Sequence, residues 1–181
     1  MTSSLSNSKS GSLMDWQKIK LLALDVDGML TDGTVFMGAD QMELKQFSVL
    51  DGLGLVCLKK IGIKLAIIIS ARLSPTTQSR AEELQFDHVI QGRKDKGNAL
   101  KELSDELDYS ADQLCYVGDD VIDIPAIQYA GVGIAVLNAM PAAKKAAHWV
   151  TVNTGGKGAV REVSDRILEG RNESVLSLST T

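Results

Sequence analysis

Apolar and polar positions follow two alternating periods along most of the chain. Runs in which every residue or nearly every residue is apolar, such as residues 19–24 and 64–69, are typical of strands buried on both faces of a sheet. Between the runs, apolar residues such as Leu53, Val56 and Cys57 recur at the spacing of a helix. The pattern therefore predicts strands that alternate with helices.

This alternation extends over residues 15–170. Strands are predicted at residues 19–24, 64–69, 88–90, 114–117, 132–136 and 149–152. Helices are predicted at residues 51–61, 75–85, 96–107, 123–129, 140–146 and 158–169. Such an order implies right-handed crossovers between parallel strands, so the predicted fold class is α/β, a Rossmann-like three-layer parallel sheet with helices on both faces.

A β-hairpin insertion is predicted directly after the first strand. Residues 31–36 and 42–49 are rich in β-branched and aromatic residues, and the segment between them is turn-like. The insertion occupies about residues 33–48, which is too short for a separate cap domain. The predicted fold is therefore capless.

The two ends of the chain are predicted to be tails around a single domain of residues 15–170. Residues 1–14 are small, polar and without periodicity, and we expect them to be flexible. Residues 171–181 begin polar, and the apolar residues Val175, Leu176 and Leu178 come further on. This second tail is expected either to be disordered or to dock on another subunit.

Composition excludes several classes of partner. The chain has 181 residues, 44% hydrophobic and 23% charged, with a net charge of −4 and no long basic run, so nucleic acid is not expected. The apolar runs are far shorter than the roughly 20 residues of a membrane-spanning helix. The Ser-rich N-terminus has no signal-peptide core. We expect a cytoplasmic protein without membrane association, whose two cysteines are buried thiols.

Polar residues gather where predicted strands end, and a lysine begins one of the helices that follow. These residues are Asp25 and Asp27 after the first strand, Ser70 after the second, Lys96 at the helix after the third, and Asp119 and Asp120 after the fourth. Ligands bind beyond the carboxyl ends of strands in an open parallel sheet. If these strand ends are neighbours, the side chains converge on one crevice.

The paired acids suit phosphoryl transfer. Asp25 and Asp27 point to the same side of the chain, and their repulsion must be relieved by a cation or by a proton held on one of them. An ionised carboxylate can attack phosphorus, and a protonated neighbour can donate to the leaving alkoxide and then activate water. Asp119 and Asp120 add negative charge that Mg²⁺ would balance, and the all-oxygen donor set argues against zinc or copper. Taken singly, each acidic turn could equally be a strand corner or a helix N-cap.

Together these residues resemble the motifs of the haloacid dehalogenase superfamily of phosphohydrolases. The matches are Asp25-Val26-Asp27-Gly28, Ser70, Lys96, and Gly118-Asp119-Asp120 with Asp123. Longer strings, among them Asp51-Gly52-Leu53-Gly54 and residues 155–162, resemble the members that dephosphorylate an eight-carbon keto sugar acid for lipopolysaccharide precursor synthesis.

The resemblance implies a role for each matched residue. Asp25 would be the nucleophile that forms an aspartyl phosphate, Asp27 the acid and base, and Mg²⁺ would be held by Asp25, the Asp27 carbonyl and Asp119. The implied catalytic and substrate-binding groups also include Gly28, Ser70, Arg72 and Lys96. Asp120 and Asp123 would act outside the shell of direct metal ligands.

One position departs from the resembled pattern. Ala71 stands where the family usually has glycine, and we infer an ordinary backbone conformation there. The planar fork of Arg72 fits a substrate carboxylate, but this side chain could equally just balance the acidic site.

Without a cap, the site would be open to water. In the resembled family, tetramers pack their hairpins together, and a neighbour's C-terminal segment covers the site. Apolar hairpin residues that fit such an interface are Val35, Phe36, Met37, Leu44 and Phe47. We therefore predict a homotetramer.

Two alternative functions are kept open. One is a phosphatase for a nine-carbon, sialic-acid-type sugar phosphate. The other is a non-hydrolytic phospho-receiver or binding module, in which the phosphorylated aspartate would follow a later strand than it does here.

Overall fold

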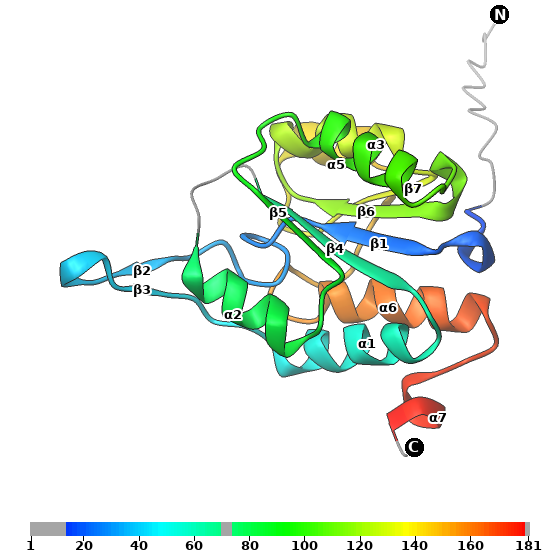
Figure 1. Ribbon diagram of the computed structural model, residues 1–181, viewed down its shortest axis with the longest axis horizontal. Coiled ribbons are helices and arrows are strands. Elements are labelled where there is room, and N and C mark those ends of the chain that lie inside the picture. Colours follow the sequence, from blue (N-terminus) through cyan, green and yellow to red (C-terminus); the bar gives the residue numbers. More distant parts are fainter. Residues whose placement is uncertain (1–13, 70–73, 180–181) are drawn as a thin grey trace, which may run out of the picture.

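A six-stranded parallel sheet forms the centre of the fold in the computed structural model, which describes residues 14–69 and 74–179 (Figure 1). The spatial order of its strands is β5-β4-β1-β6-β7-β8. Their bounds are β1 (Leu21–Leu24), β4 (Lys64–Ile69), β5 (His88–Gln91), β6 (Leu114–Gly118), β7 (Val132–Ala135) and β8 (Trp149–Val150). β1 lies between β4 and β6, so that Leu24 pairs with Ile67 on one side and Val117 on the other.

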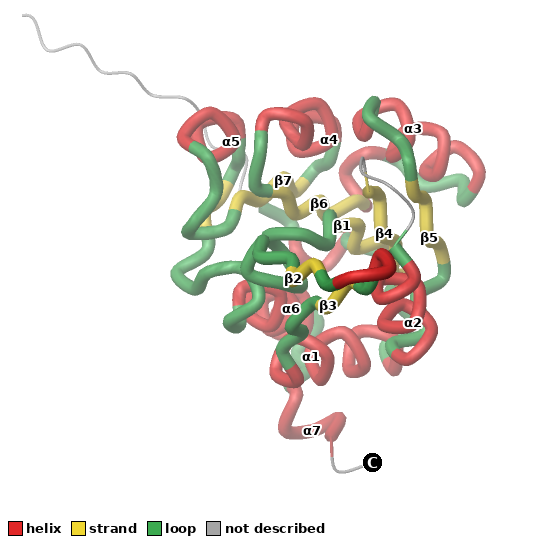
Figure 2. Tube along the Cα trace, turned by 90° about the vertical axis from the view of Figure 1, so that its left-hand side faces the viewer, coloured by secondary structure: helices red, strands yellow, loops and turns green. Residues whose placement is uncertain are grey.

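Helices cover both faces of this sheet (Figures 1 and 2). One face carries α1 (Val49–Lys60), α2 (Pro75–Glu83) and α6 (Ala159–Gly170), and α1 packs along α6. The other face carries α3 (Lys96–Glu106), α4 (Ile124–Tyr129) and α5 (Pro141–Ala146). The prediction of a three-layer parallel sheet is confirmed, and the all-apolar strand pattern is explained because all four residues of β1 are fully buried.

Short 3-10 helices join several of these elements. They are η1 (Trp16–Lys18), η2 (Ala39–Gln41), η3 (Ala111–Gln113) and η4 (Val121–Asp123). None of the helices within the described ranges has the length and apolar character that a bilayer crossing requires.

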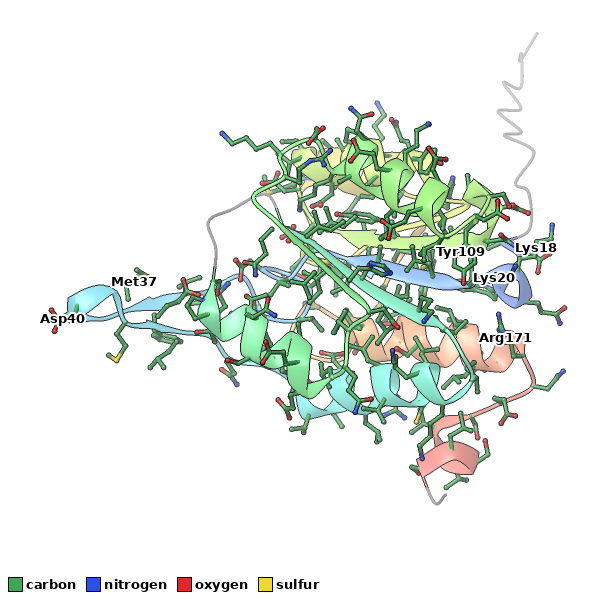
Figure 3. All side chains as sticks on the ribbon, viewed as in Figure 1. Lys18, Lys20, Met37, Asp40, Tyr109 and Arg171 are labelled. Atoms are coloured by element: carbon green, nitrogen blue, oxygen red, sulfur yellow. The ribbon has the colours of Figure 1, made fainter. Side chains whose placement is uncertain are left out.

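The hairpin insertion projects from the body of the molecule, with Met37 and Asp40 near its tip (Figures 1 and 3). It consists of β2 (Phe36–Met37) and β3 (Glu43–Leu44), which pair antiparallel and are much shorter than predicted. The prediction that strand character continues to residue 49 is wrong. Ser48 instead caps α1 by accepting hydrogen bonds from the N–H groups of Leu50 and Asp51, so the helix begins at Val49.

The C-terminal segment folds onto its own chain. Residues Val175–Ser179 form the short helix α7, which packs against α1 and buries Val175. The Lys60 ammonium also donates a hydrogen bond to the carbonyl oxygen of Leu178 at 2.7 Å. Part of the tail for which disorder or docking on another subunit was expected is thus a helix held by contacts within one chain.

The two ends of the central strand face different surroundings. Lys20, just before β1, lies over the ring of Tyr109 at the end of the sheet away from the hairpin (Figure 3). The carboxyl end of β1 lies at the opposite end, on the side from which the hairpin leaves the body (Figure 1), and Asp25 is the residue that follows this strand. The candidate chemistry therefore gathers at the carboxyl ends of the strands, as the parallel sheet requires.

Candidate active site

The strand ends that carry the predicted acids are neighbours in space. β1 pairs directly with both β4 and β6, and the N–H of Asp25 donates to the carbonyl oxygen of Val117 in β6 at 3.2 Å. Asp25 and Asp119 consequently leave adjacent strands at the same edge. Ser70 and Arg72, predicted to follow β4 at this edge, lie outside the described residues.

Asp25 is held by a fully buried lysine. Lys96, the first residue of α3, places its Nζ 2.6 Å from Oδ2 of Asp25 and 2.7 Å from Oδ1 of Asp123. The other oxygen of Asp25, Oδ1, accepts from the N–H of Val26 at 2.7 Å. These contacts fix the orientation of the Asp25 carboxylate. Asp25 and Lys96 meet, as the prediction of converging strand ends requires, and Asp123 joins them.

Burial and charge act in opposite directions on this pair. Burial raises the pKa of Asp25 to about 6, and the nearby charge of Lys96 opposes that rise. Burial alone lowers the pKa of Lys96, but the negative charges of Asp25 and Asp123 outweigh it, so that the pKa of Lys96 is raised. The lysine therefore stays protonated and supplies a fixed positive charge.

Asp123 organises the site through four hydrogen bonds to its fully buried carboxylate. Oδ1 accepts from Lys96 and from the hydroxyl of Tyr116 at 2.8 Å, and Oδ2 accepts from the N–H groups of Asp119 at 3.0 Å and Asp120 at 3.1 Å. Sequence reasoning missed Tyr116. The available signal was its hydroxyl inside an otherwise apolar strand, since a buried tyrosine needs a hydrogen-bond partner.

Asp119 lies against the loop that follows β1. A Cβ on Gly28 would overlap the Asp119 carboxylate, and Gly28 has a φ of +89°, so both space and backbone conformation favour glycine there. Burial, together with the negative charges of Asp123 and Asp25, raises the pKa of Asp119 to about 7. Asp119 therefore sits in a place where negative charge is not fully compensated.

Asp120 contributes to the turn that carries Asp119. Its side chain is exposed and accepts a hydrogen bond from the N–H of Val121 at 2.6 Å, which caps η4. Its N–H donates to Asp123. Asp120 thus makes the capping contact expected if this acidic turn is a helix N-cap, which was the alternative interpretation of the turn.

A divalent cation fits the acidic cluster. One carboxylate oxygen from each of Asp25, Asp119 and Asp123 lies within 4.8 Å of the others, and the Lys96 ammonium contacts Asp25 and Asp123. Three carboxylates beside one ammonium leave negative charge that a hard, oxygen-seeking ion would neutralise. Because each oxygen of Asp123 already accepts two hydrogen bonds, Asp25 and Asp119 have more lone pairs available for direct coordination.

Asp27 lies beside a second lysine that sequence reasoning missed. The Nζ of Lys45, at the base of the hairpin, is 2.8 Å from Oδ1 and 3.0 Å from Oδ2 of Asp27. The Asp27 side chain is 32% exposed, whereas the Lys45 side chain is only 3% exposed. No local sequence signal marks this contact, because it joins residues 18 positions apart across the hairpin.

Comparisons with known proteins identify the family of the chain. A family model described as haloacid dehalogenase-like hydrolase matches residues 58–163. The chain is 44% identical over 150 residues to a 3-deoxy-D-manno-octulosonate 8-phosphate phosphatase of Yersinia pestis, covering 83% of this chain and 80% of that protein. It is 41% identical over 152 residues to the Escherichia coli K12 phosphatase of the same description, covering 84% and 80% of the two chains.

Among solved structures, the fold is similar to that of 3-deoxy-D-manno-octulosonate 8-phosphate phosphatase from Moraxella catarrhalis in complex with a magnesium ion, a phosphate ion and a KDO molecule. The TM-score is 0.88 and the identity 42%, over 92% of this chain and 95% of that one.

Proposed function

The chain belongs to the haloacid dehalogenase-like hydrolases, and from this premise we propose that it is a Mg²⁺-dependent 3-deoxy-D-manno-octulosonate 8-phosphate phosphatase. The products would be 3-deoxy-D-manno-octulosonate (KDO) and phosphate, in lipopolysaccharide precursor biosynthesis. The similarity to the Moraxella catarrhalis structure, whose bound molecules are a magnesium ion, phosphate and KDO, carries this proposal. The acidic cluster around Lys96 supports it independently.

We assign the nucleophile to Asp25 and the acid and base to Asp27. A carboxylate oxygen of Asp25 forms a bond to phosphorus while the bond to the leaving sugar oxygen breaks and that oxygen takes a proton from Asp27. Asp27 then accepts a proton from water, whose oxygen attacks phosphorus and releases Asp25. Asp25 is positioned for its role because Lys96 and the N–H of Val26 each hold one of its oxygens.

The residues that would hold Mg²⁺ are Asp25, the backbone carbonyl of Asp27 and Asp119. When bound, the ion would neutralise charge on the phosphoryl group and on the acids around it. Asp123 and Asp120 act indirectly, since Asp123 holds Lys96 and the N–H of Asp119, and Asp120 caps the same turn. This division follows from the hydrogen bonds already accepted by Asp123.

The substrate-binding residues in this proposal come from three segments. Gly28 lies where a side chain would collide with Asp119, and Lys96 has a third ammonium proton beyond the two donated to carboxylates. Ser70 is proposed to bind a phosphate oxygen, and Arg72 the substrate carboxylate. These last two assignments stay predictions.

We also propose a homotetramer, formed through the hairpin. Phe36, Met37 and Leu44 are each more than half exposed, and exposed apolar surface continues onto the first turn of α1 at Val49 and Leu50. The two other predicted interface residues, Val35 and Phe47, are half-buried in the single chain, and Arg80 lies over the ring of Phe47 at 5.5 Å. A cytoplasmic location stays a prediction.

Phosphate release from synthetic sugar phosphates tests the proposed function. We expect hydrolysis of the eight-carbon substrate with Mg²⁺, loss of activity in EDTA, and recovery when Mg²⁺ is restored. Faster turnover of a nine-carbon sialic-acid-type phosphate would replace the proposed substrate. A stable phosphorylated protein that releases no phosphate would instead indicate a phospho-receiver.

A further inference from the structure

Lys45 is a buried cation placed at the proposed acid and base. Its ammonium lies within 3.0 Å of both carboxylate oxygens of Asp27, and its side chain is 3% exposed. Removing an ammonium from water is costly unless its partners compensate for the lost hydration. The contact is therefore unlike the exposed ion pairs of this protein, such as Lys101 with Asp105 on α3.

The surroundings of Lys45 hold the ammonium in place from two sides. Thr77, in the first turn of α2, accepts a hydrogen bond from Nζ at 3.3 Å, and Oε1 of Glu43 lies 3.6 Å away. Glu43 is tied to the same helix, because its Oε1 accepts from the Ser74 hydroxyl at 2.5 Å and its carbonyl oxygen accepts from Thr76 at 3.2 Å. The hairpin base and the start of α2 thus form a rigid support.

The two oxygens of Asp27 are not equivalent in this arrangement. Lys45 donates a hydrogen bond to Oδ2 at 3.0 Å. Oδ1 is buried, and no group in the described part of the chain donates a hydrogen bond to it, although the Lys45 charge lies 2.8 Å away. Lys45 therefore holds both oxygens, and the exposed part of the Asp27 side chain, which a substrate can reach, does not include Oδ1.

We propose that Lys45 is a positioning residue for Asp27, which holds the carboxyl group in one orientation so that its exposed part meets the leaving oxygen of the substrate. The inference rests on the proposed phosphatase function, with Asp27 as acid and base. As the bond from phosphorus to the leaving oxygen breaks, the proton of Asp27 moves to that oxygen, and the resulting carboxylate lies beside the Lys45 cation. Asp27 regains a proton from water in the second step, and Lys45 neither gains nor loses one.

This role predicts a specific kinetic change in Lys45→Met. Acid and base assistance is worth roughly 10²–10⁴-fold, so misalignment of Asp27 is expected to lower kcat by about tenfold or more. KM for the sugar phosphate is expected to stay within about threefold, because Lys45 acts on Asp27 and not on the bound substrate. Lys45→Arg, which keeps a cation, is expected to recover part of kcat.

A second substrate separates positioning from general damage. The nitrophenolate of p-nitrophenyl phosphate leaves without needing a proton, so the burst of nitrophenolate in the first turnover is expected to persist in Lys45→Met. Lys101→Met, which removes a lysine from an exposed ion pair on α3, serves as the matched control and is expected to keep parental kinetics. Melting temperatures of all variants establish that they are folded.

Each outcome decides the question. The role of Lys45 would be overturned if Lys45→Met kept the parental kcat, with or without a rise in KM. It would also be overturned if that variant lost the burst and sugar phosphate turnover equally, or if a folded Lys45→Arg showed no recovery of kcat. A parent protein that releases phosphate from neither substrate with Mg²⁺ would instead overturn the proposed function.

Discussion

The carboxylate of Asp51, in the first turn of α1, accepts a hydrogen bond from the N–H of Arg161 at 2.8 Å and so caps the N-terminus of α6. It also accepts from the N–H of Gly158 at 3.3 Å. The preceding loop packs on the loop after β1, since a Cβ on Gly155 would strike the backbone of Gly28. A contact between two helices thereby supports the segment that carries Asp25 and Asp27.

Replacement of this cap is expected to destabilise the fold. Asp51→Ala leaves two N–H groups without their acceptor, and loss of an N-cap costs about 1–2 kcal/mol. For a chain of this size, that corresponds to a drop of about 2–8 °C in Tm, measured by thermal unfolding.

Asp165→Ala is the matched control on the same helix. Asp165 pairs with the Arg161 guanidinium at 2.8 Å in a partly exposed position, so its loss is expected to cost no more than about 0.5 kcal/mol. Similar Tm values for the two variants would show that the Asp51 cap contributes little.

Asp25→Asn is expected to abolish phosphate release while the protein stays folded. The amide keeps the size of the side chain but cannot attack phosphorus. Asp27→Asn, by contrast, keeps the nucleophile and is expected to lose roughly 10²-fold or more in kcat. Phosphate release and circular dichroism measure both effects, and parental turnover by Asp25→Asn would refute a covalent aspartyl mechanism.

Mg²⁺ is expected to stabilise the protein more at pH 8 than at pH 5. The pKa of Asp119 is raised from 3.8 to about 7 by burial and by the charges of Asp123 and Asp25. At a pH between these two pKa values, Asp119 therefore carries a proton in the metal-free folded state and has lost it in the unfolded state. The contribution of this group to stability therefore falls as pH rises from about 4 to about 7, and the ionised carboxylate that results is the form that binds metal.

Thermal unfolding with Mg²⁺ and with EDTA at the two pH values measures this difference. Asp119→Asn removes the titrating group and a proposed ligand, and it is expected to suppress most of the Mg²⁺-dependent rise in Tm. An equal Mg²⁺ effect in the variant and the parent would place the ion elsewhere.

The sheet and most helices could be predicted because their signals are local. Buried parallel strands leave uninterrupted apolar runs, as at residues 64–69, and the proline at residue 75 marks the start of α2. The hairpin strands are shorter than predicted because β-branched and aromatic composition at residues 42–49 does not exclude a helix start, and Ser48 caps α1, which begins at Val49.

The candidate site could be predicted only as far as strand ends determine it. Asp25, Lys96 and Asp119 converge because β1 and β6 are neighbours and α3 begins beside them. Lys45 could not be predicted because its contact with Asp27 spans 18 positions, and a single sequence records no such pairing. Tyr116, by contrast, bonds to nearby Asp123, and its hydroxyl inside an apolar strand was the signal that could have identified it. Likewise, α7 depends on packing against α1 and not on a periodic pattern of its own.

The exposed hairpin provides the test of assembly. Phe36 is 60% exposed in the single chain, and if hairpins pack together in a tetramer, Phe36→Lys would bury a lysine at each copy of the interface. Size-exclusion chromatography with light scattering is expected to give four chain masses for the parent and a smaller species for the variant. Val152→Lys, at a position 75% exposed and outside the hairpin insertion, is the matched control and is expected to keep the parental mass. A parent protein that elutes with the mass of one chain would contradict the proposed tetramer, and the exposed apolar residues at the tip of the hairpin would then need another partner.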